Sequence, residues 1–438
     1  MPAPMSSSTG GSRPASAVAP LKGAYYVLAT LTLVNVLSNI DRSLPAILIE
    51  AIRHDIAMTD FQFGLLNGLL FTTIYCTFSF PMAKYSDRHD RRALISTCLL
   101  VWSLATAASA GAVNFLHLLL GRSGVAIGEA GAIPASQSII SDYFPPARRG
   151  FALSVLMSGS AVGTMLGMVV GGWLSDAVGW RAALVLVGMI GLIWAAVTRF
   201  TVAEPRRTAT APSESARRQA PTLLETFRHL GRRAAFRHLA AGAALYAVFS
   251  SALGAFTPSY LIRTYGVTTA QAGLYFGVVF GLAGGAGAVI GGILSDRLGR
   301  RDERWNLWVP AIGLSVAAPA AFLAFYVSSL QACLLFLIVP KLLGPLFLGT
   351  CYAVMYRMVG AHMRAVSSAV LLLIIQGIGA ALGPVVAGFM SDWLRPTLGP
   401  ASIKVALMAI SLVLAWGALH FFMASRSLAD AVLPEGEE

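Results

Sequence analysis

Long apolar runs, separated by short polar connections, make up almost the whole of this 438-residue chain. A membrane-spanning helix needs about 20 predominantly apolar residues. These runs are continuous, whereas the strands of a membrane barrel alternate over about 10 residues. The pattern therefore predicts an all-α membrane protein with twelve transmembrane helices, at residues 24–47, 62–84, 93–112, 115–140, 150–174, 181–200, 238–261, 270–294, 306–328, 330–356, 365–391 and 402–424.

Composition agrees with this prediction, because 56% of the residues are hydrophobic and only 12% are charged, against about 25% in a soluble domain. The net charge of +12 does not indicate nucleic-acid binding, because the basic residues gather in alternate loops. Such asymmetry predicts a multi-pass protein of the cell (inner) membrane with basic loops and both termini in the cytoplasm. The most basic loops contain Lys84, Arg88, Arg91 and Arg92, then eight arginines from Arg206 to Arg237, and then Arg297, Arg300, Arg301 and Arg304.

A short phrase recurs at the end of every third predicted helix. It reads AKYSD at 83–87, GWLSD at 172–176, GILSD at 292–296 and GFMSD at 388–392. The repeat unit is therefore three helices, and four units make two six-helix halves. Inverted three-plus-three repeats within six-helix halves are a signature of one transporter architecture.

The repeat divides the chain into two bundles joined by a linker. We expect the N-terminal tail to be disordered because it is rich in Ser, Ala, Pro and Gly. The predicted parts, in order, are this tail at 1–20, an N-terminal six-helix bundle at 21–200, a cytoplasmic linker at 201–237, a C-terminal six-helix bundle at 238–425 and a C-terminal tail at 426–438.

The second part of the linker has a helical pattern of its own. Thr222 and Glu225 have the spacing of a capping box, and the apolar residues from Leu223 to Leu230 share one face. This pattern predicts a short amphipathic helix on the inner membrane surface. A solvated linker with incidental leucines is the alternative.

Two predicted helices carry stripes of glycine. Small residues four apart let two helices approach closely. Such a stripe suits either a sliding interface between the halves or static packing, and the sequence leaves both possibilities open. The glycines are Gly159, Gly163, Gly167 and Gly171 in the fifth helix, and Gly379 and Gly383 in the eleventh.

Four charged residues interrupt the apolar runs, namely Asp41 and Arg42 in the first predicted helix and Arg122 and Glu129 in the fourth. A charge at the bilayer centre costs at least about 2.5–3.5 kcal/mol, so such residues usually face partners or a water-filled path. Arg122 and Glu129 share one helix face but lie about 10.5 Å apart along the axis. This separation is too long for an ion pair, so we expect partners from the first helix or a substrate between them.

A proton carrier that works near neutral pH needs a carboxyl group in an apolar site, where the neutral form is favoured. Glu129 lies among glycine and alanine residues and is the first candidate for proton coupling. Asp41 is the second candidate, because Arg42 beside it is expected to keep it ionised. A purely structural role for these charges is the alternative.

The C-terminal half has one deep charge, Lys341, in otherwise apolar helices with several aromatic residues. A cavity charged on one side and apolar on the other would suit an amphipathic anion. Lys341 could instead extend to the membrane surface, as long basic side chains do near helix ends. The predicted substrate-binding residues are Arg42, Arg122, Glu129 and Lys341.

Two loops carry a family signature. Residues 292–301 read GILSDRLGRR, and residues 83–92 read AKYSDRHDRR. This pattern resembles the signature loop of the major facilitator superfamily, in full at the later position and with departures at Ala83, Tyr85 and Asp90 at the earlier one. The resemblance implies the major facilitator fold and a conformational latch at the cytoplasmic ends of the helices. It assigns gating roles to Asp87, Arg88, Asp296 and Arg297.

A narrower resemblance rests on the charged helices. The sequence RSGVAIGEA at 122–130, IISDYF at 139–144 and NIDR at 39–42 are similar to motifs of the Spinster family. Members of that family move lysophospholipids, sphingosine 1-phosphate and similar lipids. The resemblance implies a lipid substrate, and roles in transport and proton coupling for Asp41, Arg122 and Glu129.

These observations predict a proton-coupled secondary transporter of amphipathic anionic lipids that works by alternating access. We expect no enzymatic activity, metal or cofactor, because no phosphate-binding loop follows a strand and the four cysteines lack metal-ligand spacing. The expected partners are the lipid substrate, protons and membrane lipids, with no nucleic acid and a monomeric state. The alternatives are a multidrug/proton antiporter, an organic-anion symporter, and, from another class, a lipid scramblase or a non-transporting sensor.

Overall fold

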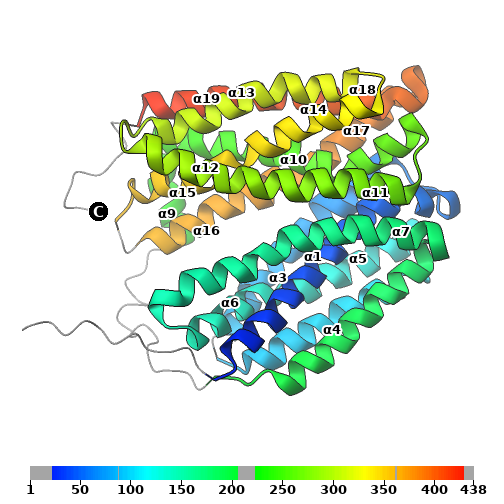
Figure 1. The fold of residues 1–438 in the computed structure, drawn as a ribbon, viewed down its shortest axis with the longest axis horizontal. Coiled ribbons are helices and arrows are strands. Elements are labelled where there is room, and N and C mark those ends of the chain that lie inside the picture. Colours follow the sequence, from blue (N-terminus) through cyan, green and yellow to red (C-terminus); the bar gives the residue numbers. More distant parts are fainter. Residues whose placement is uncertain (1–21, 87, 206–221, 361–362, 429–438) are drawn as a thin grey trace, which may run out of the picture.

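The computed structural model describes residues 22–86, 88–205, 222–360 and 363–428. These residues are almost entirely helical, and Figure 1 shows that the helices form two elongated bundles lying side by side. One bundle contains the elements from α1 to α7, and the other contains those from α10 to α19. The predicted all-α architecture in two halves is confirmed.

Several crossings of the N-terminal half are interrupted. The fourth crossing breaks at Ala130 and Gly131, directly after Glu129. The fifth and sixth crossings form one long element that reverses at Gly179, whose φ of 83° lies in the left-handed region that favours glycine. The elements of this half are α1 (Ala24–Asp55), α2 (Asp60–Gly64), the π-helical η1 (Leu65–Leu69), α3 (Leu70–Ser86), α4 (Arg91–Ser109), α5 (Phe115–Glu129), α6 (Ala132–Tyr143) and α7 (Pro146–Thr201).

The C-terminal half repeats this plan. Its second and fifth crossings contain π-helical segments, and its last two crossings are joined at Gly399. The elements are α10 (Ala234–Tyr265), α11 (Thr269–Val278), η2 (Val279–Ala283), α12 (Gly284–Gly299), α13 (Trp305–Tyr326), α14 (Leu330–Leu343), η3 (Gly344–Leu346), α15 (Phe347–Tyr356), α16 (Arg364–Leu372), η5 (Leu373–Ala380), α17 (Ala381–Leu398), η6 (Gly399–Ala401), α18 (Ser402–Ser411) and α19 (Val413–Arg426).

Length and apolarity alone identify eight helical segments of the described chain that can cross a membrane. Two of these, Pro146–Thr201 and Val366–Arg426, are long enough for two crossings each. The remaining crossings are α1 and the broken pair α5–α6, which carry the intramembrane charges. The twelve predicted crossings are therefore present, with six in each half.

The glycine stripes pack within their own halves. A Cβ atom on Gly163 in α7 would lie 2.4 Å from the carbonyl oxygen of Val36 in α1. In the other half, a Cβ on Gly383 in α17 would lie 2.2 Å from the carbonyl oxygen of Val248 in α10. Of the two possibilities left open by the sequence, close packing inside each bundle is the one that these contacts support.

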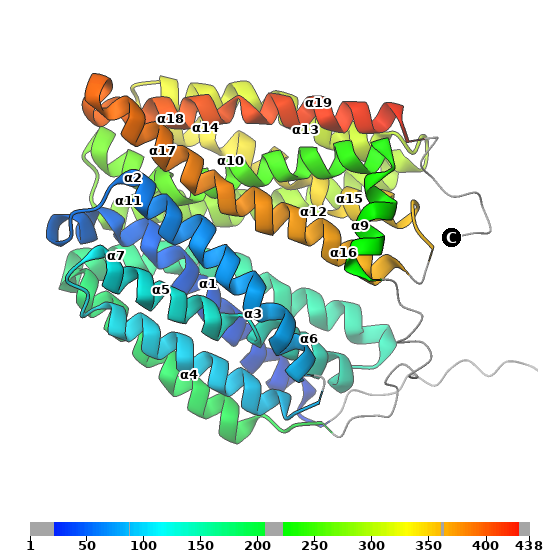
Figure 2. The same ribbon diagram turned by 180° about the vertical axis from the view of Figure 1, so that it is seen from behind.

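The two halves lie close together at one end and diverge at the other (Figures 1 and 2). At the first end, here called the closed end, α2 lies beside α17 and α11 lies beside α7. The opposite end, here called the open end, is where α1 begins and α19 finishes. The bundles therefore form a V whose arms enclose the space described below.

The described part of the linker contains α9 (Leu223–Gly231), and residues 206–221 lie outside the described chain. The predicted capping box is present: the N–H of Thr222 donates to Glu225 Oε2 at 2.8 Å, and the N–H of Glu225 donates to Thr222 Oγ1 at 3.2 Å. The bond from the Thr222 backbone holds the pKa of the Glu225 carboxyl below its usual range. Figure 2 shows α9 at the open end, crosswise to the long helices.

Candidate functional site

A cavity of about 430 Å³ lies between the two halves, at the middle of the long helices. Its N-terminal wall is mainly polar and its C-terminal wall is mainly apolar. The N-terminal wall consists of Asn39, Arg42, Ser43, Ala46, Asn67, Thr72, Thr164 and Met168. The C-terminal wall consists of Tyr246, Ala247, Ser250, Ser251, Gly254, Ala255, Phe280, Phe347, Leu348, Ile375, Gln376, Ala380 and Pro384.

Arg42 brings a positive charge to this cavity and is paired with a carboxylate behind it. Its Nε donates to Oε2 of Glu129 at 2.5 Å, and the two side chains are 30% and 0% exposed. Glu129 is the last residue of α5, where the fourth crossing breaks. Broken helices at the membrane midplane are characteristic of transporter sites. The ion pair therefore joins the first and fourth crossings at the cavity wall.

Aromatic rings hold both arginines of the cluster. The guanidinium of Arg42 lies 4.5 Å from the ring centre of Tyr75 and 5.4 Å from that of Phe71. The guanidinium of Arg122 lies 4.2 Å from the centre of the Phe71 ring. A cation over an aromatic face gains roughly 0.5–2 kcal/mol, more when water is excluded. Both rings belong to α3, so the second crossing also shapes the site.

Arg122 is buried, and the structure pairs it with backbone rather than with a carboxylate. Its two terminal nitrogens donate to the carbonyl oxygens of Asp41 at 3.1 Å and Arg42 at 3.4 Å. Within the described chain, its Nε and Oε1 of Glu129 are buried polar atoms without a hydrogen-bond partner. An unpaired buried polar group costs about 1–3 kcal/mol. The cluster of four charged residues therefore leaves two buried atoms without a hydrogen bond, one on a cation and one on an anion.

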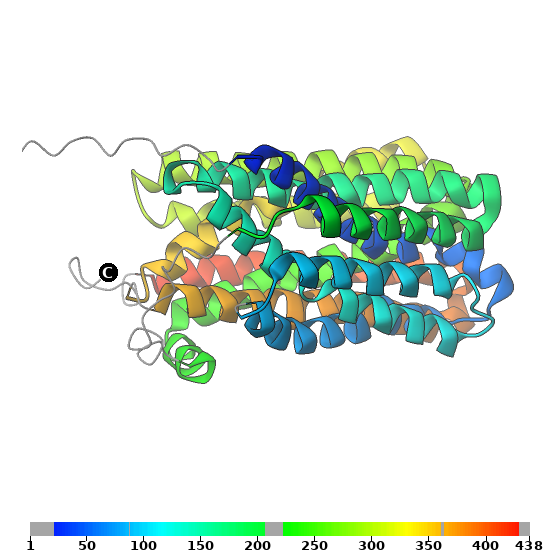
Figure 3. The same cartoon turned by 90° about the horizontal axis from the view of Figure 1, so that it is seen from below.

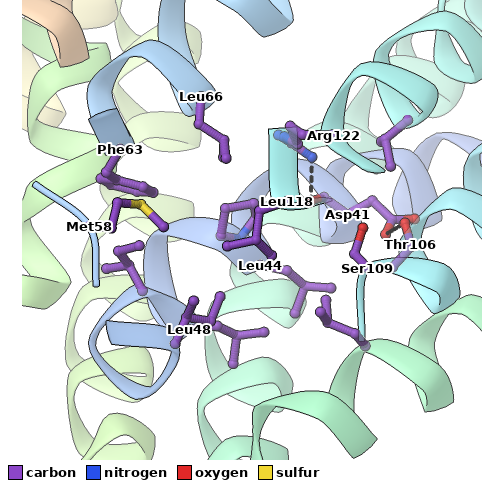
Figure 4. A pocket seen from close by; sticks show the side chains of 15 residues that line it. Asp41, Leu44, Leu48, Met58, Phe63, Leu66, Thr106, Ser109, Leu118 and Arg122 are labelled. Carbon is purple, nitrogen blue, oxygen red and sulfur yellow. Dashed lines mark hydrogen bonds between the residues drawn. The ribbon is translucent and has the colours of Figure 1, made fainter. Parts of the chain in front are cut away.

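Asp41 and Arg122 line a second, smaller pocket of about 50 Å³ inside the N-terminal half. Figure 4 shows Asp41, Thr106 and Ser109 gathered at one side of this pocket, with Met58 and Phe63 at the other. The hydroxyl of Thr106 donates to Asp41 Oδ1 at 2.7 Å. The four charges therefore form a layer between the central cavity, which Arg42 faces, and this inner pocket.

Lys341 lies one layer behind the opposite wall of the central cavity. Its side chain is buried, and Nζ donates to the hydroxyl of Ser250 at 3.1 Å and lies over the ring of Phe280. Ser250 and Phe280 both line the cavity. Lys341 therefore does not extend to the membrane surface, which was the alternative left open by the sequence.

The structure brings the four predicted N-terminal charges together but changes their pairing. Arg42 was expected to hold Asp41 ionised, yet its guanidinium turns to Glu129. No cation of the described chain lies within ion-pair distance of the Asp41 carboxylate, which accepts the Thr106 hydroxyl. Adjacent residues on a helix point in different directions, and this explains why Arg42 does not reach its neighbour. Asp41, rather than Glu129, is the carboxylate left without an ion pair.

A second group of charges joins the two halves at the closed end. Arg263 of α10 donates to both carboxylate oxygens of Glu50 in α1, at 2.8 and 2.9 Å. It also donates to both oxygens of Asp60 at the start of α2, at 3.0 and 3.2 Å. Arg53 contacts the same Asp60 at 2.6 Å. One arginine of the C-terminal half thus bridges two acids of the N-terminal half.

Two of the four repeated aspartates make further contacts between the halves at the closed end. Together with the bridge from Arg263, these contacts are here called the gate. Asp392 of α17 accepts the backbone N–H groups of Asp60 and Phe61, at 3.1 and 2.7 Å, in the first turn of α2. Asp176 of α7 accepts the N–H of Ala270, at 2.8 Å, in the first turn of α11. A negative charge stabilises a helix N-terminus because of the exposed N–H groups there. Each aspartate therefore binds a helix start of the opposite half.

The glycine that begins each of these two phrases permits this approach. A Cβ on Gly388 would lie 2.2 Å from the carbonyl oxygen of Asp60, and one on Gly172 would lie 2.6 Å from that of Thr269. Sequence reasoning found the phrases but did not predict this gate. A usable signal was present, because each receiving helix begins with the same T-x-x-Q capping box, at 59–62 and 268–271.

The latch predicted from the signature loops lies at the open end. Arg88 and Arg297 are exposed there. Asp87 and the side chain of Asp296 lie outside the described part of the structure. The latch that these four residues were expected to form stays a prediction.

A family model of the Major Facilitator Superfamily matches residues 31–384. The chain belongs to the major facilitator superfamily. It is accordingly a multi-pass membrane transporter and not an enzyme. The two halves, the central cavity and the repeated aspartates are the features of this chain that fit a protein whose halves move against each other.

Relatives agree with this assignment. The chain is 30% identical to an MFS-type efflux pump of Mycolicibacterium smegmatis, over 94% of this chain and 95% of the relative. It is 26% identical to human spinster homolog 1, over 90% of this chain and 79% of the relative. It also resembles the crystal structure of a bacterial homolog of the lysosomal transporter Spinster, in an inward-facing, unoccupied conformation. That likeness has a TM-score of 0.86 and 29% identity, and covers 95% of this chain and 100% of the other.

Proposed function

We propose that this protein is a proton-coupled secondary transporter of amphipathic anionic lipids, of the lysophospholipid or sphingosine 1-phosphate kind. The observation that carries the proposal is the asymmetry of the central cavity. Arg42 and its buried partners lie on one wall, and the facing wall is mainly apolar. An anionic head group would pair with Arg42, and the hydrocarbon tail would lie along the C-terminal half. The similarity to Spinster proteins, a family whose members move such lipids, supports the same class of transporter.

The pairing of Arg42 with Glu129 suggests how substrate and proton are coupled. A head group that takes the guanidinium of Arg42 leaves Glu129 buried without a cation. An isolated buried carboxylate is costly, so the group is neutralised by a proton. Substrate and proton would then bind together, with Asp41 as a second acid in the same layer. Arg122 and Lys341 would support the head group through the field of their charges behind the walls.

We further propose that the open end faces the cytoplasm and that the protein resides in the cell (inner) membrane. Exposed arginines lie at the open end in the loops after α3 and α12, as the charge asymmetry of membrane proteins requires for a cytoplasmic side. The similarity to an inward-facing Spinster structure supports the same orientation. The gate at the closed end would then face the outside.

A counterflow assay tests the proposed function. Vesicles containing the purified protein are loaded with unlabelled lysophosphatidylglycerol and supplied with a fluorescent lysolipid, with and without a pH gradient. We expect exchange without the gradient and net accumulation with it. Lysolipid transport that is the same with and without the pH gradient would indicate a scramblase. Lysolipid binding without exchange would indicate a sensor. Either result would contradict the proposal.

A second candidate is a proton-driven efflux pump for amphipathic compounds. The name of the Mycolicibacterium relative favours it, at 30% identity over nearly the whole chain. Such a pump would bind amphipathic cations, whereas Arg42 in this cavity repels them. Competition by an amphipathic cation such as ethidium, against the fluorescent lysolipid, separates the two candidates. Strong competition by ethidium would favour the pump.

A further inference from the structure

The linker helix α9 is held rigidly against the C-terminal half. Thr226 and Leu230 on one of its faces are fully buried, and α9 packs against α16 and α10. In Figure 2 it lies crosswise to the long helices, and in Figure 3 its short green coil extends beyond the outline of the bundle. A helix in this position runs parallel to the membrane plane, at the level where the crossings end.

A second face of α9 is apolar and exposed. Leu223, Leu224 and Phe227 are 43%, 57% and 50% exposed. At about 100° per residue, these three side chains fall within about 100° of one another on the helix surface. They lie next to the buried face rather than opposite it. The protein therefore covers one side of α9 and leaves the neighbouring apolar side uncovered within the described chain.

The third face is polar and basic. Arg228 and Arg232 are exposed and lie beyond the apolar face, on the side away from Thr226 and Leu230. Going around α9, the order is protein, apolar face, basic face. A helix lying in the membrane interface has this arrangement, with apolar side chains in the acyl boundary and basic ones among the headgroups.

We propose that α9 binds the surface of an anionic lipid bilayer. Leu223, Leu224 and Phe227 enter the boundary between headgroups and acyl chains, and Arg228 and Arg232 contact anionic headgroups. Basic residues beside a crossing are attracted by anionic lipids, and α10 begins three residues after α9 ends. The partner is the membrane that already surrounds the protein, so no second protein is needed to cover the apolar face. This inference does not depend on the proposed substrate.

Spin-label accessibility in vesicles tests the inference. The full-length protein, with its four native cysteines replaced by serine, receives one label at Phe227→Cys or, as the matched control on the polar side, at Glu225→Cys. Vesicles contain phosphatidylcholine with an equal amount of phosphatidylglycerol. We expect the label at 227 to be reached by oxygen and protected from a water-soluble nickel complex, with the reverse at 225.

Two outcomes would overturn the proposal. Equal access of the nickel complex to both labels would place α9 in water, and protection of the 227 label from both reagents would mean that protein covers it.

The charge contribution is tested with Arg228→Gln together with Arg232→Gln. In the wild-type background, phosphatidylglycerol should protect the label at 227 from the nickel complex better than pure phosphatidylcholine does. The double variant should lose this difference between the two kinds of vesicle. Arg300→Gln, at another exposed arginine of the open end, should keep the difference. A double variant that also keeps the difference would refute the role of the headgroups.

Discussion

Asp176 and Asp392 occupy equivalent positions in the two halves, and each accepts a backbone N–H from the first turn of a helix in the other half. The bonds, to Ala270 and Phe61, are 2.8 and 2.7 Å long. Two related contacts on either side of the cavity close the same end of the molecule. The closed end is thus held by a pair of matched interactions that must break together when the halves tilt.

Removing these caps should favour opening of the closed end. Each N-cap contributes about 0.5–2 kcal/mol, so Asp392→Ala combined with Asp176→Ala is expected to shift the balance between the two conformations by roughly fivefold to several hundredfold. Spin labels at Ala57 and Thr397, which are exposed at this end in opposite halves, report the change as a longer distance. Asp55→Asn, which breaks the ion pair of Asp55 with Arg181 inside the N-terminal half, should leave that distance unchanged.

Arg263→Gln should also weaken the closed end. This side chain binds two carboxylates, of which Asp60 is nearly fully buried. Arg53 still contacts Asp60 at 2.6 Å, so the loss should stay below the about 3–5 kcal/mol of a buried pair whose remaining charge has no other cation. We expect a lower unfolding temperature and a larger open population. A variant that keeps the wild-type distance distribution would mean that the bridge does not hold the gate.

Gly388→Ala should prevent full closure of this end, because the added Cβ would lie 2.2 Å from the carbonyl oxygen of Asp60 in the other half. The matched control is Gly163→Ala, whose Cβ would lie 2.4 Å from the Val36 oxygen within one half. The first substitution should change the distance between the halves with little loss of thermal stability. The second should lower stability without changing that distance. Identical behaviour of the two variants would contradict the distinction between gate and packing glycines.

Arg42→Gln should weaken lysolipid binding, since this arginine faces the central cavity. Hydrogen bonds to a charged group contribute about 1.5–3 kcal/mol, so the dissociation constant should rise by roughly ten- to a hundredfold. Thermal-shift titration with lysophosphatidylglycerol measures the dissociation constant. Arg122→Gln should lower stability first, because Arg122 holds two carbonyl groups of α1. Equal affinity of Arg42→Gln and wild type would exclude Arg42 as the head-group site.

The sequence was sufficient to predict the twelve crossings and the gathering of four charges between the first and fourth of them. Apolar length and the cost of intramembrane charge are local properties of the chain. The pairing of Arg42 with Glu129 was not predictable, because it depends on the rotation of α1 against α5. The gate at the closed end was missed for a similar reason. Asp176 and Asp392 act on helices distant in sequence, and only the arrangement of the halves brings them to Ala270 and Phe61.

Proton uptake on substrate binding would follow directly from the exchange of Arg42 between Glu129 and the substrate. Purified protein in weakly buffered detergent solution, with a pH indicator, is mixed with lysophosphatidylglycerol. The wild type is expected to take up protons on binding, and Glu129→Gln is expected to bind the lipid without that uptake. Binding by the wild type without proton uptake, or undiminished uptake by the Glu129→Gln variant, would contradict this exchange.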